Sequence, residues 1–393
     1  MSEREVSILT AGKDKPYALG LASALLAAGR SFDFIGSDDN DAPYLHANPR
    51  VNYLNLRGET SANAGLVKKM TRVLAYYFRL MRYALTAKPK IFHVLWNNKF
   101  EWFDRTLLML YYRLLGKKIV FTAHNVNIKQ RDGGDSFLNR LTLKIQYRLC
   151  AAIFVHTSKM KAELVEAFGV APERAVVIPM GFFAAVPNTD LTPAQAKEKI
   201  GLRPEEKAVL FFGNIAPYKG VEYLIEAFAE LAPRDPAYRL IIVGRPKGEL
   251  EYWARLRRQI DEKNLLARTL LDIEFIPDEK IEVYLKAADV LIAPYTHIFQ
   301  SGVLILGMSF GIPAIAADVG ALKEDVVEGK TGYIFPPRDS RALAQCIEKF
   351  FASEMHLRAE ATRRVIRARV LENNSWSKVA GIIAGVYHRS NES

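Results

Sequence analysis

Short apolar runs alternate with helical patterns along almost the whole chain, and this alternation limits the folds that the chain can adopt. In the first half, the expected strands cover residues 6–10, 32–35, 91–95, 119–122, 152–156 and 175–178. The helical patterns between them cover residues 18–28, 66–85, 103–115, 136–149 and 158–168. Apolar strands separated by helices are typical of parallel sheets that carry helices on both faces.

The same alternation restarts after residues 180–192, which lack helical periodicity and are expected to form a linker. Strands are expected at residues 208–212, 240–243, 273–276, 290–293, 314–316 and 332–335, with helices at 220–231, 249–263, 278–287, 302–310 and 340–351. A chain of 393 residues fits two domains of about 100–200 residues each. We therefore predict an α/β protein with two doubly wound, Rossmann-like domains that face each other across a cleft, with ligands at the C-terminal strand ends.

The domain boundaries are expected at residues 1–185 for an N-terminal domain and 186–374 for a C-terminal domain. Residues 375–393 are expected to form a helix that crosses back to the first domain. Half of the residues are apolar and a quarter are charged, which excludes a disordered chain. Two cysteines are too few for a disulfide scaffold, and no apolar stretch reaches the ~20 residues of a membrane span. The N-terminus lacks a signal-peptide pattern, so we expect a cytoplasmic protein.

Two segments of the second half are suited to bind phosphate groups. In the first, an apolar run ends at Phe212 and is followed by Gly213, then by Lys219 near the start of a helix. Glycine permits close backbone approach, and a lysine at a helix N-terminus adds a cation where the helix dipole already favours an anion. Neither the Walker pattern nor the dinucleotide pattern GxGxxG is present. The alternative is an ordinary turn with a solvated lysine.

The second segment places Ser301, Gly302 and Val303 at another helix start after an apolar run. Its backbone N–H groups are free to bind an anion, and the serine hydroxyl can cap the helix or donate a hydrogen bond. A plain helix cap is the alternative. Each segment can bind one phosphate group, so the two segments together favour a diphosphate ligand.

The segments FFGNIAPYKGVEYLIEAF, PDEKIEVYLKAADVLIAPY, SGVLILGMSFGIPAIAADVGALKEDVVEGKTGYIFPPRD and SWSKVAGIIAGVY together resemble the group 1 (family 4-like) glycosyltransferases of GT-B fold. TAHNVN, FVHTSKMKAEL and VIPMGF extend the resemblance more loosely to the first half. It implies a nucleotide-sugar donor on the second domain and an acceptor on the first, without a metal or other cofactor. It also implies a hexosyltransferase of the bacterial exopolysaccharide or surface-glycan type.

By position, the resemblance places further residues in the site. The donor diphosphate is expected to contact Gly213, Lys219, Ser301, Gly302 and Val303. Asn214 stands where an arginine is common, and the other expected donor-site residues are Gly244, Arg245 and Ile276, the last near the nucleotide base. His124 is expected near the transferred sugar, with a buried structural histidine as the alternative.

Two glutamates that are common in the family are replaced here by Ile298 and Leu306. Their absence leaves the donor sugar and the stereochemical course open. Retention is favoured by the resemblance, with the leaving phosphate accepting the acceptor's proton. Inversion needs a side-chain base, for which Asp132 and Asp135 are candidates.

The excess positive charge lies entirely in the first half. The chain has a net charge of +11; 26 basic and 15 acidic residues precede Val186, and 28 of each follow. Residues 66–90 interleave Lys68, Lys69, Arg72 and other basic residues with aromatic and aliphatic ones. This pattern is typical of a helix at an anionic membrane surface, with ordinary packing on the sheet as the alternative. No nucleic-acid-binding motif is present.

We therefore predict a metal-independent glycosyltransferase at the inner face of the cell membrane that acts on a lipid-linked saccharide or similar acceptor. Two alternatives remain: a GT-B epimerase or phosphorylase acting on soluble substrates, and a non-catalytic protein that binds nucleotide sugars.

Overall fold

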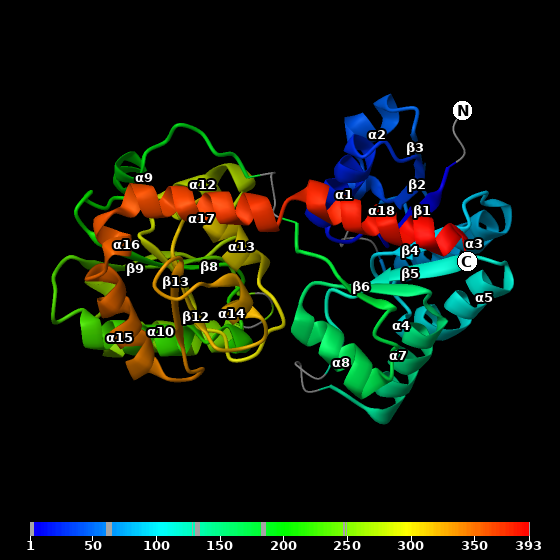
Figure 1. Cartoon of the computed structure of the whole chain (residues 1–393). Helices are drawn as coiled ribbons and strands as arrows, with labels where there is room; N and C mark the ends of the chain where they lie inside the picture. Colours follow the sequence, from blue (N-terminus) through cyan, green and yellow to red (C-terminus); the bar gives the residue numbers. More distant parts are fainter. Residues whose placement is uncertain are drawn as a thin grey trace. The chain divides into compact units, whose positions relative to one another are not determined.

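The computed structural model describes residues 4–59, 65–127, 129, 134–181, 186–246, 248 and 250–392. The chain forms two compact units. The first comprises Met1–Gly181 together with Asn374–Ser393, and the second comprises Phe182–Asn373. Each unit is an α/β domain built on a parallel sheet (Figure 1).

The sheet of the first unit has the strand order β3-β2-β1-β4-β5-β6-β7, and all neighbouring strands run parallel. Its strands are β1 (Val6–Leu9), β2 (Phe32–Gly36), β3 (Val51–Asn55), β4 (Ile91–Val94), β5 (Lys118–Thr122), β6 (Ala152–Val155) and β7 (Ala175–Val177). The helices are α1 (Lys15–Ala27), α2 (Pro43–Ala47), α3 (Leu66–Thr86), α4 (Glu101–Phe103), α5 (Met109–Leu114), α7 (Phe137–Leu149), α8 (Ser158–Phe168) and α18 (Trp376–Glu392). The order reverses direction at β1, as in a doubly wound fold.

The sheet of the second unit has the order β10-β9-β8-β11-β12-β13 and is also parallel. Its strands are β8 (Lys207–Phe212), β9 (Tyr238–Val243), β10 (Thr269–Asp272), β11 (Val290–Ala293), β12 (Ala314–Ala317) and β13 (Gly332–Phe335). The helices are α9 (Pro193–Lys199), α10 (Val221–Leu231), α11 (Leu250–Glu262), α12 (Asp278–Ala287), α13 (Gly302–Ser309), α14 (Leu322–Asp325), α15 (Ser340–Phe351), α16 (Glu354–Leu357) and α17 (Ala359–Asn373).

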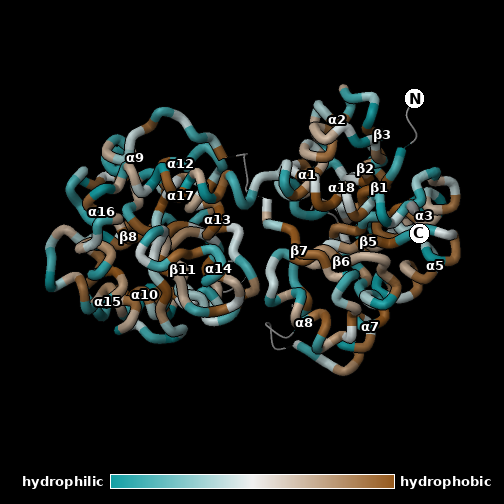
Figure 2. The backbone as a smooth tube through the Cα atoms, viewed as in Figure 1, coloured by the Kyte–Doolittle hydropathy of each residue, from teal (hydrophilic) through white to brown (hydrophobic). Residues whose placement is uncertain are grey.

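The central strands of both sheets are buried on both faces. Every residue of β1, β4, β6, β11 and β12 is buried. Figure 2 shows these strands as hydrophobic segments beneath helices that alternate between hydrophobic and hydrophilic residues. The predicted parallel, doubly wound sheet is thus confirmed in each unit.

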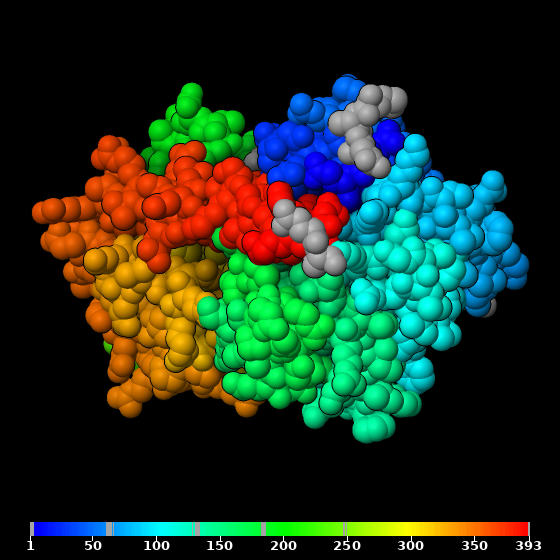
Figure 3. All heavy atoms as spheres, turned by 45° about the vertical axis from the view of Figure 1, so that its right-hand side comes forward, coloured from blue at the N-terminus to red at the C-terminus, as the bar shows by residue number. Residues whose placement is uncertain are grey.

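The last helix, α18, belongs to the first unit although the second unit precedes it in sequence. Figure 3 shows this C-terminal segment among the N-terminal elements of that unit. Trp376 occupies the space that side chains on Gly20 and Gly181 would fill, since a Cβ on either would lie 2.4 Å from its ring. Farther along, the Tyr387 hydroxyl lies 2.6 Å from Nδ1 of the fully buried His93 on β4.

Three local expectations differ from the structure. The strand expected at 273–276 is wrong, because β10 lies earlier, where Thr269–Asp272 pairs in register with Leu240–Val243. Strand β3 was not expected, since its side chains are mostly only partly buried and show no long apolar run. The helix expected at 103–115 contains a π-helical stretch, Asp104–Leu108, between α4 and α5.

Candidate functional site

Two glycines follow neighbouring strands of the second sheet and let their turns approach each other. Gly213 follows β8 with φ 119°, and Gly244 follows β9 with φ 133°. A Cβ on Gly244 would lie 2.1 Å from the carbonyl oxygen of Gly213, so a larger residue requires the turn to move. A Cβ on Gly213 would lie 3.3 Å from Cγ2 of Val303. The two turns and the first residues of α13 therefore meet at the C-terminal end of the sheet.

Lys219 lies in the short 3-10 helix Pro217–Lys219 (η3) that precedes α10 and is only 6% exposed. Its Nζ is 4.1 Å from the ring centroid of Tyr295 and 5.4 Å from that of Tyr218. No carboxylate pairs with Lys219 anywhere in the described parts of the chain. The alternative of a solvated lysine is therefore wrong, and a buried ammonium without a counter-ion is suited to bind an anion.

The loop around Lys219 is held against the end of β11. Gly220 has φ 63°, and a Cβ there would lie 2.0 Å from the carbonyl oxygen of Pro294. The backbone N–H of Thr296 donates to the carbonyl of Tyr218 at 2.9 Å. These contacts place Lys219 next to Tyr295, a pairing of residues 76 positions apart that the sequence pattern did not indicate.

Ser301 is the N-cap of α13 and is 2% exposed. Its Oγ accepts a hydrogen bond from the Leu304 N–H at 3.2 Å and lies 3.1 Å from the Tyr295 hydroxyl. The serine side chain therefore acts as a cap. The N–H groups of Gly302 and Val303, in the first turn, have no acceptor within the helix and are the groups available to an anion.

The remaining residues expected in the donor site have different surroundings. Asn214 is exposed in the turn after β8. Arg245 is exposed too, and its guanidinium lies 5.3 Å from the ring of Phe275. Ile276 is 7% exposed, and its side chain packs in the core of the second unit, four residues beyond the end of β10. Its side chain is therefore not available to a ligand.

The two positions that lack glutamate carry apolar side chains, and both side chains contact the apolar core of the second unit. Leu306 is 7% exposed within the core, and Ile298 packs against the same core. The carbonyl oxygen of Ile298 lies 1.9 Å from where a Cβ on Gly320 would stand. Neither position presents a carboxylate to a ligand.

In the first unit, His124 belongs to an aromatic cluster at the C-terminal ends of the strands. It follows β5 and stacks on Trp96, which follows β4, with centroids 4.3 Å apart and planes at 3°. The ring of Tyr17 meets the His124 ring edge-on, with centroids 4.6 Å apart. Nδ1 of His124 lies 3.2 Å from Nε2 of His156, which follows β6. The opposite nitrogen, Nε2, is buried and has no hydrogen-bond partner.

The environment keeps His124 uncharged. Burial lowers its pKa well below the usual value, and the neighbouring His156 lowers it further. Burial also lowers the pKa of His156, to about 4. A neutral His124 can orient a hydroxyl through Nε2 and does not act as a cation at neutral pH.

Of the two candidate bases, Asp132 lies outside the described residues. Asp135 does not cap the following helix, because Ser136 does so through the Asn139 N–H. Its Oδ1 instead accepts from the Asn139 side chain at 2.8 Å, and its Oδ2 accepts from Arg140 at 2.6 Å. Partial burial opposes ionisation, but these hydrogen bonds prevail and lower the pKa of Asp135 to about 2. Such a carboxylate is a weak base.

The described residues include no group of three or more His, Cys, Asp or Glu side chains that could hold a metal ion. None of the helices in the described ranges combines the length and apolarity needed to cross a membrane.

Two family models match the chain, one in each unit. "Glycosyltransferase Family 4" matches residues 16–182, and "Glycosyl transferases group 1" matches residues 194–368. Among curated proteins, D-inositol 3-phosphate glycosyltransferase of Rhodococcus jostii (strain RHA1) is 26% identical over 86% of this chain and 76% of that protein. The protein of the same name from Nocardia farcinica is 32% identical over 67% of this chain and 59% of that protein.

Solved structures share the fold over nearly the whole length. Sucrose-phosphate synthase from Thermosynechococcus elongatus superposes with a TM-score of 0.78 at 21% identity, covering 99% of this chain and 100% of that one. Anabaena Alr3699/HepE in complex with UDP-glucose superposes with a TM-score of 0.74 at 18% identity, covering 98% and 99%. Each of these likenesses establishes the fold.

Proposed function

Because the chain belongs to the group 1 glycosyltransferases and uses a nucleotide sugar, we propose that it transfers the sugar to a lipid-linked saccharide at an anionic membrane surface, with retention of configuration. The product of such a transfer enters a surface glycan or exopolysaccharide. The donor binds the second unit and the acceptor binds the first.

The buried, unpaired Lys219 is the observation that carries the donor proposal. It lies near the start of a helix and beside Tyr295, whose hydroxyl contacts the cap of α13. A diphosphate bound at the Gly213 turn meets this ammonium together with the first N–H groups of α13. UDP and UDP-glucose are bound by Anabaena HepE, which shares the fold.

The same groups account for the chemistry of transfer. When the bond between the sugar and the diphosphate breaks, its electron pair stays on the leaving phosphate, which thereby gains a negative charge. Lys219 and the N-terminus of α13 stabilise this charge where it develops. In a retaining reaction, the acceptor oxygen bonds to the anomeric carbon on the face that the phosphate leaves. Its proton passes to the phosphate oxygen, so no protein base is required.

His124 is proposed to position the transferred sugar through Nε2, the nitrogen without a protein partner. Its stacking on Trp96 fixes the plane of the ring, and its contact with His156 occupies the other nitrogen. A hydrogen bond from a neutral imidazole orients a hydroxyl without adding charge. The low pKa of Asp135 disfavours an inverting course with this residue as the base.

The membrane part of the proposal is supported by the surface of α3. Val67, Leu74 and Phe78 are 77%, 56% and 68% exposed, whereas Tyr76, Tyr77, Leu80 and Ala84 pack inward. Helix α3 therefore presents an apolar side that the first unit does not use for packing.

Neighbouring elements of the same unit add exposed apolar side chains: Phe100, Trp102, Leu107, Leu110, Leu114, Phe137, Leu138 and Leu141. Lys68, Lys69 and Arg82 of α3 are exposed as well. Two basic residues of α3 are engaged by the protein, because Arg72 pairs with Glu59 at 2.8 Å and Arg79 donates to the Leu56 carbonyl at 3.3 Å.

A phosphorylated small molecule is the second candidate acceptor, and the names of the relatives favour it. Proteins named for D-inositol 3-phosphate recur among the curated relatives, and a solved structure with this fold is a sucrose-phosphate synthase. Such an acceptor needs no membrane surface.

Product analysis separates the two acceptors. The purified protein is incubated with UDP-glucose and, in parallel, with lipid-linked saccharides in vesicles or with inositol phosphate in solution. Glycosylated lipid with the anomeric configuration of the donor supports the main proposal. If product forms from inositol phosphate alone, the acceptor is a phosphorylated small molecule and not a lipid-linked saccharide. A product with inverted anomeric configuration refutes the retaining course.

A further inference from the structure

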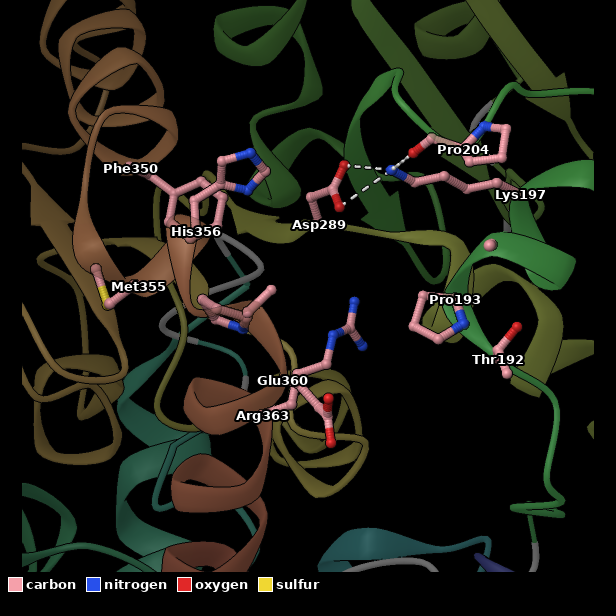
Figure 4. Close-up of a pocket in the computed structure, with 13 residues that line it drawn as sticks. Thr192, Pro193, Lys197, Pro204, Asp289, Phe350, Met355, His356, Glu360 and Arg363 are labelled. Atoms are coloured by element: carbon pink, nitrogen blue, oxygen red, sulfur yellow. Dashed lines mark hydrogen bonds and ion pairs between the residues drawn. The ribbon is translucent and has the colours of Figure 1, made fainter.

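A hollow in the second unit lies at the end of the sheet opposite to the glycine turns. Figure 4 shows the residues that line it. Its volume is about 540 Å³, within the usual range of about 300–1,000 Å³ for small-molecule sites. Pro204, Asp289 and Pro313 line it, and they precede β8, β11 and β12. The turns after Gly213 and Gly244 follow the other ends of β8 and β9, so this hollow is separate from the proposed donor site.

One wall of the hollow holds a buried ion pair that is complete in itself. Lys197, on α9, is 5% exposed and donates to Asp289 Oδ2 at 2.9 Å and to the Pro204 carbonyl at 3.1 Å. The same oxygen of Asp289 accepts from the Ala208 N–H at 2.7 Å. The charges of this lysine and this aspartate cancel, and neither needs a ligand.

The facing wall contributes a cation that is not balanced. Arg363, on α17, donates to the Ala288 carbonyl through Nη2, and no carboxylate in the described part of the chain forms an ion pair with it. Figure 4 shows its guanidinium extending from α17 into the hollow. Glu360, at the rim, has an 88% exposed side chain and contacts Arg364 at 3.8 Å. The inner lining therefore carries one excess positive charge.

The rest of the lining is mostly apolar, with Thr192 and His356 as its other polar members. Phe350 and Met355 are 1% and 5% exposed, and Pro193 and Ala194 face them from the N-terminal turn of α9. A guanidinium is a planar fork that matches a carboxylate with two parallel hydrogen bonds. We propose that this hollow binds a small organic carboxylate, with the carboxylate on Arg363 and an apolar body against Phe350 and Met355.

The probe is 2-naphthoate, with the neutral amide 2-naphthamide as its matched control. Binding to the full chain is measured by titration calorimetry in the presence of saturating UDP, so that the proposed donor site does not contribute. We expect naphthoate to bind at least about tenfold more tightly than the amide, because only the charged group pairs with Arg363. Arg363→Met should remove this preference, and Arg363→Lys should retain part of it.

Ala359→Trp tests the site without altering a buried side chain. Ala359 lines the hollow and is exposed, so an indole there fills the hollow from the surface. We expect this variant to fold normally and to lose naphthoate binding, while Lys219→Ala leaves it unchanged. Equal binding of naphthoate and the amide overturns the proposal. So does undiminished binding to folded Ala359→Trp, or no binding to the native chain at about 1 mM. None of these outcomes depends on whether the protein transfers a sugar.

Discussion

Replacing Lys219 with methionine should separate the folding of the second unit from its binding of a donor. Methionine keeps much of the side-chain volume and removes the charge. A hydrogen bond to a charged group contributes about 1.5–3 kcal/mol, so the dissociation constant of UDP should rise about 10- to 150-fold. Transfer should slow by a similar factor or more, because the charge on the leaving phosphate grows during the reaction.

The stability of the ligand-free protein should change little. The variant loses the contact of Nζ with the Tyr295 ring, 4.1 Å away, which contributes about 0.5–2 kcal/mol. It also no longer buries a cation without a counter-ion, which offsets that loss. We expect the free energy of unfolding to stay within about 1 kcal/mol of the native value.

Titration calorimetry with UDP and chemical denaturation measure the two quantities on the same sample. Lys280→Met is the matched control, because Lys280 lies in the same unit with a 60% exposed side chain. It should change neither quantity. If folded Lys219→Met binds UDP as tightly as the native protein, Lys219 does not hold the diphosphate.

Three further perturbations test other parts of the structure. Gly244→Ala should lower the free energy of unfolding by at least about 1 kcal/mol more than Gly248→Ala does. A Cβ at Gly244 meets a backbone carbonyl, whereas one at Gly248 meets nothing within 4 Å. If chemical denaturation shows the same loss of unfolding free energy for both variants, the two turns do not approach each other closely. Burial lowers the pKa of His93 to about 3. Its contribution to stability is therefore complete above pH 6.5, its ordinary pKa, and is lost as the pH falls toward 3, at about 1.4 kcal/mol per pH unit. His93→Gln should flatten the pH dependence of the unfolding free energy by that slope between pH 4 and 6, and an unchanged slope would show that His93 is not held neutral. Replacing Lys68, Lys69 and Arg82 with glutamine should weaken binding to anionic vesicles about 100-fold, because each basic residue contributes about 1 kcal/mol. Co-sedimentation with anionic and with zwitterionic vesicles measures this binding. If the native protein binds both kinds of vesicle equally, α3 has no membrane role.

Much of the fold follows from local sequence. The central strands are short apolar runs bounded by turn residues, and both faces of a parallel sheet must be covered, so β1, β8 and β11 could be placed within about two residues. The glycine turn after β8 and the helix start at Gly302 were predictable as well. Both depend on backbone geometry that only a few residue types permit.

Edge strands were harder to predict. Strand β3 and strand β10 lie at the edges of their sheets, where fewer side chains are buried and the apolar signal is weak. We predicted the strand at the apolar residues 273–276, but the residues that pair with β9 are Thr269–Asp272. Pairing between strands is a long-range contact, and hydropathy over a few residues does not reveal it.

The sequence by itself determined the two parallel-sheet units, the glycines at the strand ends and the helix N-terminus at Gly302 that is suited to bind an anion. These features depend on residues close together in the chain. Only the tertiary structure decided that Lys219 is buried on Tyr295, that Trp96 stacks on His124, and that Arg363 extends unpaired into a hollow. Each of these depends on side chains brought together from different elements of the fold. Whether a lysine or an arginine has a counter-ion is set by its neighbours in space, which chain periodicity does not specify.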